Sequence, residues 1–140
     1  MIFALKEAMA GSGFKLAQLL VWVKNQAVIG RRDYLAKHEL IAYGWHGAHC
    51  FFKSKDASVL YCPKPNASPL HPTTKPASLI RRLILNSSKV YDTVYDPFGG
   101  SGTTLIACEQ TKRKCLTIEI DSSYCKTITE RYKKLTRRYK

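Results

Sequence analysis

The stretch VYDPFGGSGTT, residues 94–104, is the most informative part of the sequence for the fold, because it places an acid and three glycines between a strand-like and a helix-like segment. Gly99, Gly100 and Gly102 let the backbone turn tightly and approach a ligand, and the first turn of the following helix offers unpaired N–H groups. No Gly-Lys-Ser/Thr follows, so the loop is not a P-loop, and the strict GxGxxG of dinucleotide sites is missing too. An ordinary tight turn is the alternative for the glycines taken alone.

Carboxylates lie on both sides of this loop. Asp96, at the strand end before the glycines, would repel a phosphate and suits a ligand with a cationic amine. KCLTIEID, residues 114–121, reads as a second strand ending in Glu119 and Asp121, where related folds hold a ribose by its hydroxyls. One ligand that carries both an ammonium group and a ribose is S-adenosylmethionine, which we predict as the cofactor.

The segments around the loop alternate between helix and strand. From residue 77 onward we predict a helix over 77–88, a strand over 89–96, a helix over 100–112, a strand over 114–121 and a helix from Ser122. This order is typical of a parallel sheet covered by helices, and therefore of an α/β fold. Earlier in the chain we expect a helix that ends before Gly11, strands at 16–24 and 38–45, and a short strand at 58–62. A helix is the alternative for 16–24.

Composition favours a single globular domain. The chain has 140 residues, of which 45% are hydrophobic and 24% charged, so it has enough apolar surface to order itself. We find no membrane-spanning run and expect a cytoplasmic protein. Five cysteines without a CxxC pair indicate reduced thiols. A zinc site at His46, His49, Cys50 and Cys62 matches no standard ligand spacing, and packing or loop roles are favoured instead.

The formal net charge of +13 favours a polyanionic partner. Residues 126–140 hold seven Lys/Arg and one Glu, so nearly half of the net charge lies at the last element. Two interpretations stay open for this segment: a solvated helix face with a basic tail, or direct contact with nucleic acid.

Three motifs carry a family resemblance: HPTTKP at 71–76, DPFGGSGTT at 96–104 and IEID at 118–121. In this order they resemble the DNA amino-methyltransferases that modify adenine N6 or cytosine N4, in the permuted class where the cofactor half follows the catalytic half. Residues 13–45 are similar to the stretch that follows the family's catalytic motif, especially in phage-associated members. The likeness covers essentially the whole chain.

The resemblance implies a partial Rossmann-like methyltransferase fold with an incomplete seven-stranded sheet. It divides the single domain into late strands (1–45), a short recognition-like excursion (46–70) and a cofactor-binding half (71–140). The implied S-adenosylmethionine residues are Thr73, Thr74, Lys75, Asp96, Phe98, Gly99, Gly100, Ser101, Gly102, Thr103, Glu119 and Asp121. The expected contacts to double-stranded DNA are Arg31, Arg32, Lys53 and Lys55, with a simple loop as the alternative for the stretch that carries Lys53 and Lys55. For His71 and the neighbouring prolines, a purely rigid helix entry is the alternative.

The sequence departs from the family in one respect. The family's Asp-Pro-Pro-Tyr type tetrapeptide, which holds the flipped target base, is absent from these 140 residues. We therefore expect a truncated or split enzyme of the restriction–modification type that is weak or inactive alone. A second chain or self-association would supply the missing strands next to an open sheet edge. The alternatives are a non-catalytic DNA-binding or regulatory remnant that partners another methyltransferase, and an unrelated nucleotide-binding protein. Adenine and cytosine both remain open as targets.

Overall fold

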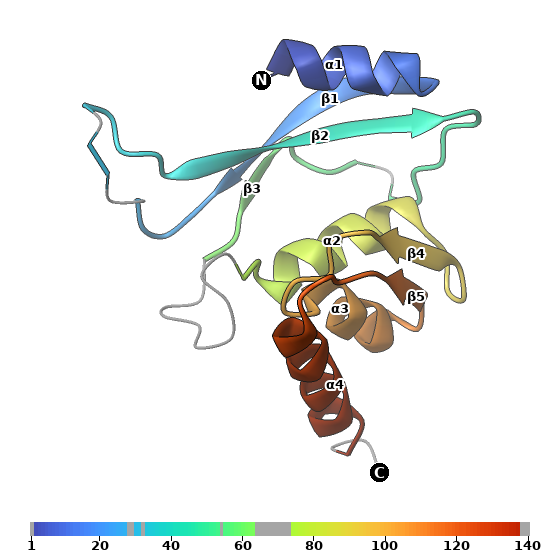
Figure 1. Ribbon diagram of the computed structural model, residues 1–140. Coiled ribbons are helices and arrows are strands. Elements are labelled where there is room, and N and C mark those ends of the chain that lie inside the picture. Colours follow the sequence, from blue (N-terminus) through green and yellow to red (C-terminus); the bar gives the residue numbers. More distant parts are fainter. Residues whose placement is uncertain (1, 28–29, 32, 54, 64–73, 138–140) are drawn as a thin grey trace. The chain divides into compact units, whose positions relative to one another are not determined.

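The computed structural model describes residues 2–27, 30–31, 33–53, 55–63 and 74–137. The chain forms two compact units, Met1–Pro63 and Lys64–Lys140, which are coloured blue to green and yellow to red in Figure 1. The boundary lies inside the predicted excursion over 46–70. The organisation as a single domain stays a prediction.

The first unit contains helix α1 (Ile2–Gly11) and strands β1 (Phe14–Val23), β2 (His38–His46) and β3 (Val59–Tyr61). Strand β1 lies between the other two, with β2 antiparallel to it and β3 parallel. The predicted helix before Gly11 and the three predicted strands are confirmed. The helix alternative for 16–24 is wrong, because a segment ending in Val21, Trp22 and Val23 favours extended backbone and pairs along its whole length with β2.

Trp22 is the centre of the first unit's core. Its side chain is 1% exposed, and its indole Nε1 donates a hydrogen bond of 2.8 Å to the carbonyl of Cys62. Lys24 is also buried, with its ammonium 2.7 Å from Glu39 Oε1 and 5.5 Å from the centroid of the Trp22 ring. The ion pair offsets the cost of burying the Lys24 charge. These contacts tie β1 to β2 and to the chain that follows β3.

The second unit contains α2 (Ala77–Ser87), β4 (Thr93–Asp96), α3 (Thr103–Thr111), β5 (Lys114–Thr117) and α4 (Ser122–Thr136). Strands β4 and β5 are parallel, with Thr93 opposite Lys114 and Asp96 opposite Thr117. The predicted order of helices and strands is thus confirmed, and so is the parallel pairing that this order implies. Both strands run toward the glycine loop (Figure 1).

Both strands of the second unit are shorter than predicted. β4 begins at Thr93 rather than at residue 89, because Tyr91 has a positive φ of 71° and Asp92 Oδ2 accepts the Lys89 N–H at 2.7 Å, which closes a turn. β5 ends at Thr117, although Ile118 still donates to the Asp96 carbonyl at 3.0 Å. Glu119 and Asp121 therefore lie beyond the strand, in the connection to α4.

The core of the second unit lies between α2, α3 and the sheet. Ile84 of α2 and Ala107 and Cys108 of α3 are buried, and three partly buried residues pack against them: Ile80 of α2, Val94 of β4 and Cys115 of β5. Burial raises the pKa of the Cys108 thiol to about 12, with the nearby Cys115 adding to the shift. All five cysteines are free, as the prediction of reduced thiols requires.

The other face of the β4–β5 sheet carries exposed apolar side chains. Tyr95 and Leu116 are direct ladder partners and are 60% and 59% exposed, and Ile118 is 56% exposed. Within the part of the chain that the structure describes, β4 pairs with β5 alone, so its second edge is open as predicted. Among the described helices, none combines the length and the apolar character that crossing a membrane needs.

Candidate functional site

The loop between β4 and α3 is built on glycines that accept no side chain. Gly99 donates its N–H to the Ile118 carbonyl at 2.8 Å, and a Cβ added at Gly99 would lie 2.5 Å from Thr117 Oγ1. Gly102 caps the start of α3 with a positive φ of 79°, and a Cβ there would lie 3.0 Å from Ile128 Cγ1. The loop therefore lies directly on β5 and α4, as close backbone approach requires.

A cavity of about 290 Å³ opens beside this loop. This volume is close to the lower end of the range for small-molecule pockets, about 300–1,000 Å³. Most of the predicted cofactor residues line it together: Thr74, Lys75, Asp96, Phe98, Gly99, Gly100, Ser101 and Thr103. Ile80 and Thr104 line it as well and were not predicted. The cavity brings the end of HPTTKP next to DPFGGSGTT.

A charged pair of opposite sign lies in the cavity wall. Lys75 supplies an ammonium and Asp96 a carboxylate. Asp96 Oδ1 accepts the backbone N–H of Phe98 at 3.0 Å, which holds the carboxylate in the turn. The Phe98 ring is 87% exposed at the cavity rim. A wall with one fixed anion and one cation suits a ligand that carries an amino and a carboxylate group, and an exposed ring can stack on a planar group.

Ser101 joins three elements at the buried end of the cavity. Its Oγ lies 3.4 Å from Thr74 Oγ1, and both side chains are buried. Arg131 of α4 donates from Nη1 to Ser101 Oγ at 3.1 Å and also to the Ser101 carbonyl. Partial burial lowers the pKa of the Arg131 guanidinium, which nevertheless stays charged. Sequence reasoning missed Arg131 by counting it with the basic tail. Its spacing of three residues from the apolar Ile128 was the available signal, since that spacing places it on the inward helix face.

Glu119 holds the loop from outside the cavity. Its Oε1 accepts the Asp121 N–H at 2.9 Å and its Oε2 accepts the Gly100 N–H at 2.6 Å. These backbone donors, that of Asp121 first, lower the pKa of the Glu119 carboxyl. The carboxylate therefore fixes Gly100, which has a positive φ, and lies at the edge of the loop rather than in the cavity lining.

Asp121 has a capping role in the structure. Its Oδ1 accepts the Ser123 N–H at 2.7 Å and the Tyr124 N–H at 3.4 Å at the start of α4. The Ser123 hydroxyl also donates to it at 2.5 Å, and these contacts, led by that hydroxyl, lower the pKa of the Asp121 carboxyl. Gly102 likewise serves the fold, since it is buried against Ile128 and does not line the cavity.

The predicted DNA-binding residues lie in the first unit. Arg31, Lys53 and Lys55 are exposed there, and Arg32, like Thr73 of the cofactor motif, lies outside the described residues. Lys53 and Lys55 follow a cluster of ring contacts formed by Tyr43, Trp45, His49 and Phe51. His49 Nε2 lies 3.0 Å from the Tyr43 hydroxyl, and the described residues contain no group of three or more metal-ligating side chains.

The chain is similar to known DNA methyltransferases. The DNA methylase family model for N6 and N4 enzymes matches residues 45–130. The type II methyltransferase M.HpaI of Haemophilus parainfluenzae is 45% identical over 73 residues, which are 52% of this chain and 23% of that protein. The DNA adenine methyltransferase YhdJ of Escherichia coli K12 is 50% identical over 56 residues, 40% of this chain and 19% of YhdJ. The matched part thus spans about a quarter or less of these two relatives.

Solved structures match more of the chain. The crystal structure of the M1.HpyAVI–SAM complex superposes with a TM-score of 0.80 at 30% identity and covers 93% of this chain and 68% of that one. PvuII DNA methyltransferase, described as cytosine-N4-specific, matches with a TM-score of 0.73 at 20% identity, over 94% of this chain and 56% of that one. The predicted α/β methyltransferase fold with an incomplete sheet is confirmed.

Proposed function

Because the chain belongs to the DNA methylase family of N6 and N4 enzymes, we propose that it serves the methylation of an exocyclic amino group in DNA, with S-adenosylmethionine bound in the second unit. Bound S-adenosylmethionine supplies the electrophilic methyl group. The observation that carries the proposal is the single cavity in which Thr74 and Lys75 meet the loop from Asp96 to Ser101. M1.HpyAVI, whose structure contains this cofactor, has the same fold.

The cavity wall fits the amino-acid end of this cofactor. Asp96 would pair with the ammonium and Lys75 with the carboxylate, since the two side chains line the same space with opposite charges. The exposed Phe98 ring offers a stacking surface for a planar group of the ligand. Arg131 and Thr74 would act as positioning residues, because their contacts to Ser101 fix the cavity wall without needing the ligand.

Glu119 is proposed as the ribose ligand. Its carboxylate is already oriented toward the loop by the N–H groups of Gly100 and Asp121. Each carboxylate oxygen can accept a further hydrogen bond, so ribose hydroxyls can be bound without breaking these contacts. Asp121 would then contribute by ordering α4 and the connection that carries Glu119.

The target base needs groups that these 140 residues do not contain. No Asp-Pro-Pro-Tyr type tetrapeptide occurs in the sequence, so we propose that the base-holding groups lie outside it and that this chain alone transfers little or no methyl group. The exposed Tyr95 and Leu116 and the open edge of β4 support a covering partner, which can be a second chain. Residues 46–70, with Lys53 and Lys55, are proposed as a short recognition segment, together with Arg31 and Arg32.

Cofactor binding is tested by isothermal titration of the chain with S-adenosylmethionine. Asp96→Asn keeps the shape of the side chain and an oxygen for the Phe98 N–H but removes the charge, and we expect at least about tenfold weaker binding, or about 1.4 kcal/mol. Glu130→Gln is the matched control, because this exposed carboxylate lies on α4 away from the cavity. Equal affinities for wild type and Asp96→Asn would reject the assigned site.

Methyl transfer is tested separately with labelled S-adenosylmethionine and duplex DNA. We expect cofactor binding without label in the DNA. Efficient labelling by the purified chain would contradict the proposal that the base-holding groups lie outside this sequence, and it would leave the cofactor site in place.

A further inference from the structure

We propose that the outward face of α4 is a docking surface for the phosphate backbone of duplex DNA, separate from the cofactor cavity. Four exposed cations lie along this face: Lys126, Lys133, Lys134 and Arg137. Glu130 is the carboxylate among them, so the face has a formal charge of four minus one, or +3. None of these five residues lines the cofactor cavity.

Helix α4 separates its charged residues by function. On the inward side Ile128 is buried, Arg131 donates to Ser101, and the Tyr132 hydroxyl donates to Glu109 Oε2 at 3.3 Å. On the outward side, Lys126, Lys133, Lys134 and Arg137 have no ion pair or side-chain hydrogen bond within the described part of the chain. The inward cation is used by the fold, and the outward cations are available to a partner.

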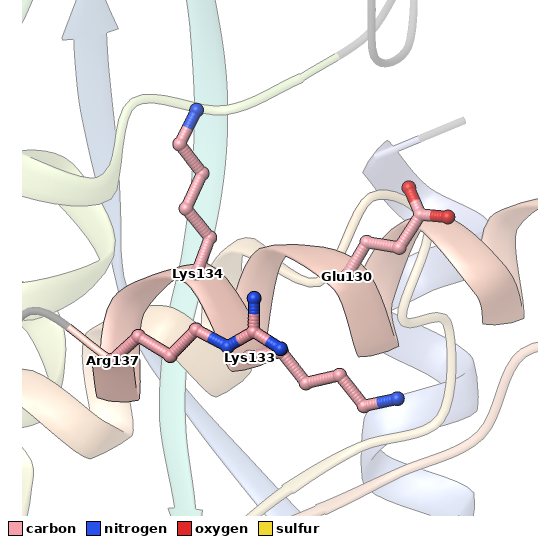
Figure 2. Close-up of a pocket in the computed structure, with 4 residues that line it drawn as sticks. All are labelled: Glu130, Lys133, Lys134 and Arg137. Carbon is pink, nitrogen blue, oxygen red and sulfur yellow. The ribbon is translucent and has the colours of Figure 1, made fainter.

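The outward face is hollowed in two places along the helix. One hollow of about 490 Å³ is lined by Glu130, Lys133, Lys134 and Arg137 (Figure 2). A second, of about 340 Å³, is lined by Cys125, Lys126, Thr129, Glu130 and Lys133. The row from Lys126 to Arg137 is about 16 Å long at a rise of about 1.5 Å per residue. A row of this length can face several successive phosphates of one DNA strand.

The helix dipole explains only part of this charge pattern. Lys133 and Lys134 lie in the last turn of α4, where cations stabilise the C-terminal end of a helix. Lys126 lies in the N-terminal half of the helix, where the helix dipole does not stabilise a cation. The unpaired row also carries mutual repulsion that a bound polyanion would relieve. The cations of the row would in turn replace counterions condensed on the phosphates and release them. Since the chain belongs to a DNA methylase family, duplex DNA is the polyanion that this surface fits.

The test measures binding of a short fluorescent DNA duplex of arbitrary sequence to the full chain by anisotropy, over a series of salt concentrations. In the triple variant Lys133→Gln, Lys134→Gln, Arg137→Gln we expect at least about tenfold weaker binding near 0.1 M salt. The slope of the logarithm of the binding constant against the logarithm of the salt concentration, here called the salt slope, should be smaller in magnitude by about 2 to 3. Glu130→Gln should tighten binding, because it removes the negative charge of the face. Glutamine keeps the helix propensity close to that of lysine and arginine.

A matched triple variant controls for net charge. Lys6→Gln, Lys37→Gln, Lys114→Gln removes the same charge at exposed positions outside α4 and should leave the salt slope nearly unchanged. Equal losses of DNA affinity in the two triple variants would overturn the proposal, and so would unchanged DNA affinity in the α4 variant. Binding of polyglutamate as tightly as DNA would also overturn it, because the surface would then fit acidic protein segments.

The same variants keep this inference distinguishable from the cofactor proposal. The α4 triple variant should retain the full thermal shift with S-adenosylmethionine, since its residues lie off the cavity. If DNA binding depends on α4 but S-adenosylmethionine gives no thermal shift, the cofactor site alone is rejected. A normal cofactor shift with DNA binding independent of α4 would reject the docking surface alone.

Discussion

Arg131 of α4 donates a hydrogen bond of 3.1 Å to the Oγ of Ser101, 30 residues earlier in the chain, and a second one to the Ser101 carbonyl. Ser101 in turn contacts Thr74 at 3.4 Å. A single guanidinium thus connects the last helix to the glycine loop and, through it, to the end of the HPTTKP motif. The cavity wall is held by contacts between elements that are distant in sequence.

Replacing Arg131 should loosen both the loop and the cofactor site. In Arg131→Gln the charge-assisted bonds to Ser101 are lost, and we expect the free energy of unfolding to fall by about 1.5 to 3 kcal/mol. Affinity for S-adenosylmethionine should fall about tenfold, which corresponds to about 1.4 kcal/mol. Denaturant melts and titration calorimetry measure the two effects.

Two further variants separate positioning from general stability. Arg131→Lys keeps one donor and should recover part of the cofactor affinity. Lys134→Gln, a change of charge on the outward side of the same helix, should leave affinity unchanged. If Arg131→Gln lowers stability while cofactor affinity stays at the wild-type value, the positioning role is wrong.

Gly102→Ala should destabilise the second unit. The residue has a φ of 79°, and its Cβ would lie 3.0 Å from Ile128 Cγ1, so both backbone and packing oppose a side chain. The left-handed conformation alone costs about 1 to 2 kcal/mol for a residue with a Cβ. Gly11→Ala, at the end of α1 with nothing within 4 Å of the added Cβ, should be neutral or slightly stabilising in the same denaturant melts. Similar losses in both variants would contradict this account.

Acid should weaken the second unit through Glu119 and Asp121. The folded-state pKa of each carboxyl is lowered, from ordinary values of 4.5 and 3.8, so each contributes stability that is present above those values. That stability is lost as pH falls through the lowered folded-state pKa values. The free energy of unfolding should therefore decline below about pH 4.5, and less steeply in the double variant Glu119→Gln, Asp121→Asn. If the free energy of unfolding declines equally steeply with falling pH in the wild type and the double variant, other carboxyls dominate the acid sensitivity.

The cysteines should react in the order of their exposure. Cys50 and Cys125 are exposed, whereas Cys108 is 0% exposed and burial raises the pKa of its thiol to about 12. With iodoacetamide near pH 8, we expect rapid alkylation of the two exposed thiols and slow alkylation of Cys108, because the thiolate is the reactive form. Peptide mass spectrometry reads out each site. Denaturant should abolish the difference, and equal rates without denaturant would show that the core opens readily.

Local sequence patterns predicted the second unit well, because its helices and strands are short and follow one another closely along the chain. The apolar spacing of 77–88, the small residues of 100–104 and the apolar run of 114–118 each have one favourable local conformation. The strands were predicted too long. For β4 the reason is that the turn at Tyr91 and Asp92 depends on a side-chain contact rather than on residue propensity.

The α/β order, the glycine loop and the carboxylates that flank it could be read from the sequence, because glycine conformation and hydrophobic periodicity are local properties. Which of these residues contact one another depends on how the helices and strands pack. Packing brings Glu119 to the Gly100 N–H and Arg131 to Ser101, apart from the outward cations of the same helix, whereas the Asp121 cap is a local contact with Ser123 and Tyr124. The Glu119 and Arg131 contacts join residues 19 and 30 positions apart, which packing sets and residue types alone do not encode.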